Sequence, residues 1–146
     1  MLHDPEEEHD CFSDNTHNSH FYDAKGIQNV YLGEYTRVDG SKIKGSSIAD
    51  LVALKNTGVN SDLTAKLADT MSKMTVLVKT AEAGEAYDQM IGENNKSGNK
   101  KVLDVVNALT AQTKAIEKAV STLGLTTLEI EGSDSLDAPE KVGSDG

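Results

Sequence analysis

The residues that could do chemistry gather in the first twenty positions of the chain. All four histidines lie there, together with the one cysteine, Cys11, and a run of carboxylates between Asp4 and Asp14. Imidazole nitrogens, thiolates and carboxylates are the side chains that bind divalent metal ions. This clustering is the strongest functional signal in the sequence.

His17 and His20 are three positions apart in a segment predicted to be helical, so both could face one side and bind a metal through imidazole nitrogens. His9 and Cys11 lie just upstream, where a chain that folds back over the helix start could add ligands. The alternative is that these histidines only keep an acidic, polar N-terminus solvated. The same alternative applies to the run of glutamates at positions 6–8, as a solvated arm or as charge at a helix start.

Other catalytic patterns are missing. The chain has no H-E-x-x-H zinc motif, no phosphate-cradling glycine loop and no G-x-S-x-G turn. Because Cys11 precedes Phe12 and has no basic neighbour that would activate its thiol, we predict a small buried residue there. Met71 and Met74 are predicted to be core. The sequence offers no self-sufficient catalytic constellation.

The elements that must position these residues are predicted to be helices. Pro5 and Pro139 are the only prolines, and aromatic residues make up only 4% of the chain. The expected N-caps are Asp14, Ser47 and Ser61, and Gly124 is expected to end the last helix. Apolar spacing predicts four helices, near residues 15–35, 47–56, 62–91 and 100–123. The fold class is therefore all-α, an up-and-down bundle of about four helices, with the stretch DGSKIKGSS as a loop.

Charge divides the chain into three parts: an acidic N-terminal segment (1–13), a helical bundle domain (14–125) and an acidic tail (126–146) that we expect to be disordered. The net charge of −10 belongs to the ends, because the middle holds 13 acids and 13 bases. A basic footprint for nucleic acid is absent. No apolar run approaches the roughly 20 residues of a membrane helix. The start, MLHDPEEEHD, opposes a signal peptide, so we expect the chain as written not to be exported on its own.

Two runs carry a resemblance to a known family. The first is EHDCFSDNTH, from Glu8 to His17, and the second is AKGIQNVYLGEY, from Ala24 to Tyr35. Together they resemble the start of the C-terminal half of imelysin-like proteins, which include iron-regulated and insulin-cleaving bacterial proteins. The similarity is strong over about 28 residues and extends more weakly to about Leu125. The stretch Asn18-Ser19-His20 departs from the family pattern.

The resemblance implies a two-domain, all-helical protein of the bacterial periplasm or outer membrane, linked to iron acquisition and classed by some as a metallopeptidase. The family's G-x-H-x-x-E motif belongs to its N-terminal half and is absent here. By position, this chain would contribute Glu8, His9 and His17 as metal ligands, and Ser13 and Asp14 as ligand-binding residues, to a site between the halves. Iron or zinc is the implied cofactor.

The resemblance leaves three functions open. The chain could be a metal- or ligand-binding half that needs the missing N-terminal domain as its partner. It could keep peptidase chemistry of the insulin-cleaving type, although the absent motif argues against this. It could also be an inactive truncated fragment. The resemblance implies no catalytic residue in this chain, and the metal, the ligand and the oligomeric state stay open.

Overall fold

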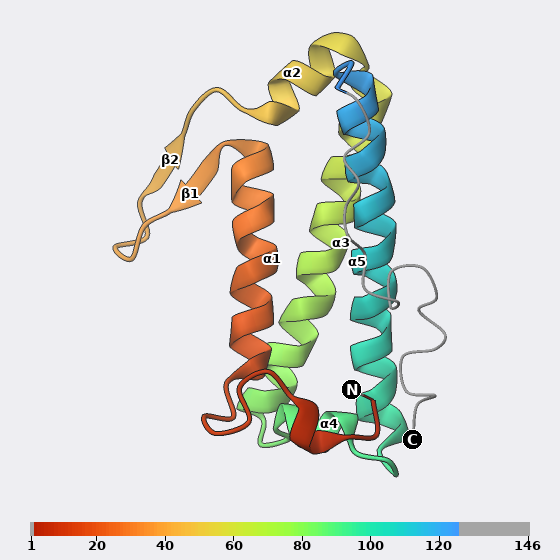
Figure 1. The fold of residues 1–146 in the computed structure, drawn as a ribbon. Coiled ribbons are helices and arrows are strands. Elements are labelled where there is room, and N and C mark those ends of the chain that lie inside the picture. The colour runs from red at the N-terminus through yellow and green to blue at the C-terminus, as the bar shows by residue number, and fades with distance from the viewer. Residues whose placement is uncertain (1, 126–146) are drawn as a thin grey trace.

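The computed structural model describes residues 2–125 and consists almost entirely of helices. Three long helices lie side by side, with the central one packed against both neighbours (Figure 1). The long helices are α1 (Thr16–Leu32), α3 (Thr57–Glu82) and α5 (Lys96–Thr122). Two short helices lie at opposite ends of this layer, α2 (Ile48–Lys55) and α4 (Tyr87–Ile91). The predicted all-α bundle is confirmed.

The helix starts follow from short polar residues, although only one of the expected caps is correct. Ser47 caps α2 through a reciprocal capping box with Asp50, as predicted. Helix α3 begins earlier than expected, because the Asn56 side chain accepts a hydrogen bond from the Val59 amide, and Ser61 lies inside the helix. Asp14 does not cap α1: it has a positive φ of 50°, and Asn15 occupies the N-cap position.

The helix predicted over residues 62–91 is two helices. Helix α3 ends at Glu82, and Gly84 adopts a φ of +102°, a conformation outside the helical region that glycine adopts at no steric cost. Helix α4 then starts at Tyr87 and lies across the end of α5. Apolar residues recur at helical spacing on both sides of Gly84, so the sequence pattern did not reveal that the chain changes direction there.

The helix predicted to reach Tyr35 ends at Leu32, because Gly33 adopts a left-handed φ of +63°. A small hairpin of β1 (Glu34–Thr36) and β2 (Lys42–Lys44) follows, with Tyr35 opposite Ile43 in antiparallel register. The stretch predicted to be a loop therefore contains a strand. A strand of three residues is too short to show the alternation of apolar and polar side chains by which strands are predicted.

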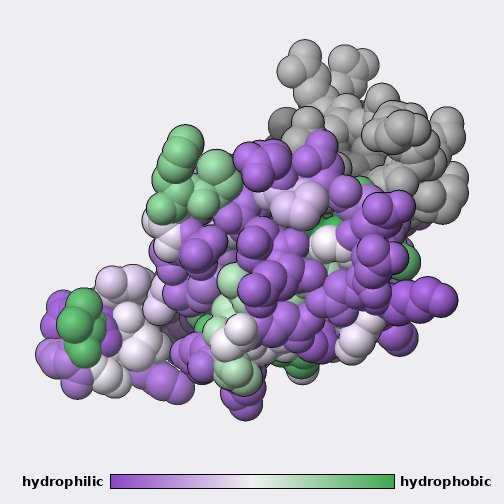
Figure 2. Space-filling model, turned by 90° about the horizontal axis from the view of Figure 1, so that it is seen from below, coloured by the Kyte–Doolittle hydropathy of each residue, from purple (hydrophilic) through white to green (hydrophobic). Residues whose placement is uncertain are grey.

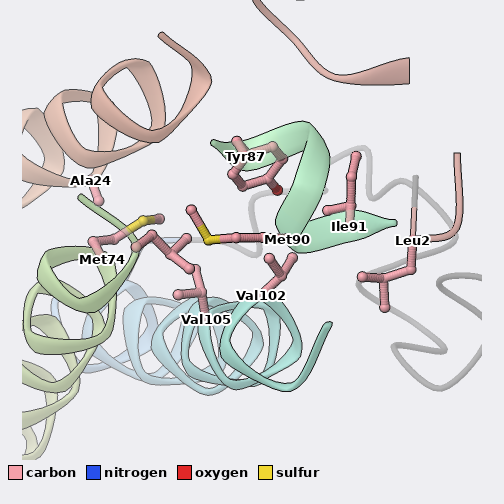
Figure 3. Packing of buried hydrophobic residues seen from close by; sticks show 9 residues of the cluster. Leu2, Ala24, Met74, Tyr87, Met90, Ile91, Val102 and Val105 are labelled. Carbon is pink, nitrogen blue, oxygen red and sulfur yellow. The ribbon is translucent and has the colours of Figure 1, made fainter. Parts of the chain in front are cut away.

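The core consists of two clusters at different levels of the bundle. The cluster near α2 contains Tyr31 of α1 and Leu63 and Leu67 of α3. The other lies near α4, where Tyr87, Met90 and Ile91 meet side chains of α1, α3 and α5, as well as Leu2 (Figure 3). Met74 is buried and Met71 packs against the cluster, so the prediction that both belong to the core is confirmed.

Within residues 2–125, no helix is long and apolar enough to cross a membrane. The predicted acidic tail, residues 126–146, lies outside the described residues.

Candidate functional site

The histidine-rich N-terminal segment folds onto the end of the bundle that carries α4. Leu2 is buried in the core there, and the His3 amide donates a 2.7 Å hydrogen bond to the carbonyl of Ile91, the last residue of α4. A single turn of 3-10 helix (Pro5–Glu7) follows, with Asp4 as its cap. Seen from this end, the surface is mostly hydrophilic, with separate hydrophobic patches (Figure 2). The segment is thus anchored at α4 before it reaches α1.

Thr16, the first residue of α1, connects the segment to the helix. Its side chain is fully buried. The hydroxyl accepts a 2.9 Å hydrogen bond from the Asp10 amide and lies close enough to the Glu8 carboxylate to lower its pKa. This one hydroxyl therefore fixes the position of Asp10 relative to the helix.

Glu8 is a buried acid in an acidic neighbourhood. Burial raises the pKa of its carboxyl, the nearby Thr16 hydroxyl opposes that shift, and the negative charges of Asp88, Asp14 and Asp10 add to the rise. Its Oε2 atom is buried and has no hydrogen-bond partner in the protein. A buried acceptor without a partner costs stability unless another group binds it.

His17 is half-buried and presents a second unpartnered atom. Its Nε2 lies 3.2 Å from the side-chain amide nitrogen of Asn18, whereas Nδ1 is buried and makes no hydrogen bond. An imidazole nitrogen without a partner can donate a proton to a ligand or, when deprotonated, bind a metal.

The histidine that His9 meets is His20, not His17. The rings of His9 and His20 have centroids 5.8 Å apart, and His20 also makes an edge contact with the Tyr87 ring at 5.7 Å. Burial lowers the pKa of His20, the nearby His9 lowers it further, and Asp23 and Asp10 oppose the shift. Burial, with the charge of Glu8, raises the pKa of Tyr87 to about 12, so its phenol stays protonated. His20 therefore contacts both His9 and the ring of Tyr87.

Asp10 holds the other side of His9. Its carboxylate lies 3.3 Å from His9 Nδ1 and accepts a short hydrogen bond from the Ser19 hydroxyl. The hydrogen bond from Ser19 lowers the pKa of Asp10 most, and the nearby His9 lowers it further. Asp10 is consequently ionised and fixed beside an imidazole that is itself mostly exposed.

The structure places the remaining predicted residues on the surface. Ser13 is exposed and bonds only the carbonyl of Asp10, and Asp14 is exposed on its strained turn. Cys11, predicted to be buried, is exposed instead, because the chain turns outward there and leaves Phe12 in solvent as well. Among residues 2–125, no three His, Cys, Asp or Glu side chains are arranged to hold a metal ion.

Sequence reasoning missed Thr16, Ser19 and Tyr87. A buried Thr at a helix start resembles an ordinary cap, and Ser19 carries no pattern of its own. Tyr87 lies 67 positions after His20, and only the packing of α4 brings it to this site.

A comparison with protein-family models matches residues 1–116 of the chain to the family described as Imelysin. A search among curated proteins gave no match. The matched part includes the whole N-terminal segment, all of α1 to α4 and most of α5. The chain therefore belongs to the imelysin family.

Proposed function

We propose that this chain acts as the C-terminal half of an imelysin-like protein and binds a metal ion or an iron-containing ligand for iron acquisition. Its N-terminal segment forms one wall of a site that an N-terminal half, carrying G-x-H-x-x-E, completes in the bacterial periplasm or at the outer membrane. One observation supports this most directly: Glu8 Oε2 and His17 Nδ1 are buried without protein partners. Both belong to the segment that matches the family.

The donor set suits iron or zinc. Glu8 supplies a carboxylate oxygen, and His9 and His17 supply imidazole nitrogens, the ligands that either metal accepts. Ser13 and Asp14 lie on the exposed turn between Glu8 and His17, where they can contact a larger ligand. A bound cation would also compensate the acidity around Glu8 contributed by Asp88, Asp14 and Asp10.

The isolated chain is expected to bind metal weakly. A tight site needs three or four convergent ligands held by surrounding hydrogen bonds. Here His9 contacts Asp10 and His20, so it does not converge with His17. We therefore propose that the N-terminal half completes the site.

Calorimetric titration of the chain with Zn²⁺ and with iron tests the proposal. We expect weak binding that decreases further in a His9→Ala, His17→Ala double variant, which removes both imidazole ligands. His3→Ala is the matched control, because His3 is exposed and lies outside the proposed ligands. Tight binding that survives the double substitution would remove these residues from the site. Metal-dependent proteolysis by the purified chain would show instead that this half is an enzyme.

A further inference from the structure

The hairpin of β1 and β2 is a small sheet that the bundle leaves uncovered. It projects from the helices between α1 and α2 (Figure 1), and all three residues of β2 are exposed. Tyr35 and Ile43 face each other across the two strands, and they are 54% and 44% exposed. A two-stranded hairpin is at best marginally stable in water, and a third strand is one of the elements that stabilise it. The exposed apolar pair therefore indicates that another strand adds to this sheet.

The outer edge of β2 is open to such a strand. Within residues 2–125 the sheet has only two strands. The Arg37 amide donates a 2.8 Å hydrogen bond to the Ser41 carbonyl, so these two residues turn their backbone groups toward each other. Because this direction alternates along a strand, Ile43 also faces β1, whereas the amides and carbonyls of Lys42 and Lys44 point away from it. An edge with free donors and acceptors is a template for strand pairing.

The side chains of this edge define the strand that fits it. Lys42 and Lys44 flank Ile43, so one face of β2 is basic and the other is apolar. A complementary strand carries two acids around a β-branched apolar residue. The chain has this pattern once, as Glu-Ile-Glu at positions 129–131, shortly after Leu125, the last described residue.

We propose that residues 128–131 add to the outer edge of β2 as a third, antiparallel strand, an interaction that goes beyond the proposed metal function. In this arrangement, Ile130 lies opposite Ile43 on the apolar face. The glutamates at positions 129 and 131 lie opposite Lys44 and Lys42, respectively, on the other face. Cross-strand pairs of opposite charge stabilise a sheet, and the added isoleucine covers exposed apolar surface.

The place where α5 ends supports the same direction of the strand. Leu123, the C-cap of α5, and Leu32, the last residue of α1, pack against the same core cluster. The end of α5 and the base of the hairpin therefore lie at the same end of the bundle (Figure 1). From Leu125 to position 129 an extended chain spans about 14 Å, and the spacing of paired strands adds about 5 Å. A segment that arrives from this side meets Lys44 before Lys42, so it runs antiparallel to β2.

Disulfide formation in the full chain tests the register. In a Cys11→Ser background, Ile43→Cys is combined with Ile130→Cys, because paired residues without mutual hydrogen bonds have Cα atoms about 4.5 Å apart, which a disulfide can span. The control combines Val38→Cys with Ile130→Cys, since Val38 is fully exposed in the hairpin turn but lies away from the proposed pair. We expect an intramolecular disulfide that forms at least about tenfold faster in the first variant, measured by mass spectrometry of proteolytic digests.

A charge exchange tests the ion pairs. Lys42→Glu places an acid opposite Glu131 and should slow the 43–130 disulfide at least about fivefold, and the added change Glu131→Lys should recover most of the rate. Lys42 makes no ion pair within the described part of the chain, so its substitution disturbs no such contact there. Lys55→Glu is the matched control, because it changes the net charge equally at the end of α2 and should leave the rate unchanged. Circular dichroism checks that each variant is folded.

Three outcomes would overturn the proposal. The first is an equal rate for the two cysteine pairs, and the second is a 43–130 rate that Lys42→Glu does not change. The third is a disulfide between two chains, which would assign the strand to a second copy. None of these variants alters Glu8, His9 or His17, so metal titration of the same proteins reports on the proposed function separately.

Discussion

The backbone amide of Asp10 donates a 2.9 Å hydrogen bond to the hydroxyl of Thr16, which is fully buried at the first position of α1. The same hydroxyl lies near Glu8, whose pKa it lowers. The N-terminal segment is therefore held against the bundle at Asp10 by one buried oxygen atom.

Thr16→Val should remove this connection with almost no change in shape. It leaves the Asp10 amide without its partner, so we expect a loss of about 1–3 kcal/mol in the free energy of unfolding. Urea denaturation measures it. Thr16→Ser, which keeps the hydroxyl, should recover most of the loss, and equal losses in the two variants would contradict the role of the hydrogen bond.

Glu8→Gln should stabilise the protein at pH 7. The folded-state pKa of Glu8 is raised, chiefly by burial, so its ionised form is disfavoured in the folded state. Glutamine is neutral and has nearly the same shape as glutamate. Below about pH 4.5, the reference pKa, Glu8 is protonated in both states and the advantage of Gln should vanish. Thermal melts at pH 7 and pH 4 measure the difference, and a lower melting temperature for the variant at pH 7 would show that the ionised carboxylate is stabilised by its contacts.

His20→Gln should reduce the loss of stability in mild acid. The folded-state pKa of His20 lies below 6.5, because burial and the neighbouring His9 outweigh the opposing charges of Asp23 and Asp10. The unfolded state therefore binds the proton first as pH falls, and the wild type loses stability from about pH 6.5 downward. Urea midpoints between pH 8 and pH 5 should decrease less in the variant. Parallel curves for the two proteins would exclude His20 as the source.

Gly98→Ala and Gly26→Ala should change stability in opposite directions. A Cβ at Gly98 would lie 2.5 Å from Cα and the carbonyl oxygen of Met90, so α4 must move away from α5, at a cost of about 1–3 kcal/mol. At Gly26 the added methyl meets open space, and the free energy of unfolding should rise by up to about 1 kcal/mol. Melting temperatures at 1 µM compare the two, and destabilisation by both would show that helix propensity does not govern position 26.

The sequence by itself determined the helical class, most helix positions and the segment where the chemistry gathers. These follow from local physics: apolar residues every three or four positions define a helix face, and Ser47 and Gly124 signal helix ends through their own backbone preferences. Where two signals competed, the local prediction was wrong, since Asn56 rather than Ser61 caps α3. The short hairpin was missed because each of its strands has only three residues, too few to show an alternating apolar pattern.

Only the tertiary structure decided which site residues meet. Three-residue spacing suggested a pair of His17 and His20, but the segment folds back over α1 and brings His9 to His20, with Tyr87 of α4 beneath. The burial of Glu8 and the exposure of Cys11 likewise depend on where the segment docks, which the anchoring of Leu2 and His3 at α4 determines. Such contacts join residues distant in sequence, and a pattern of nearest neighbours contains no information about them. The apolar cavity lined by Ile27 of α1, Leu67 of α3 and Ile116 of α5 depends in the same way on how α1 and α5 each pack on α3.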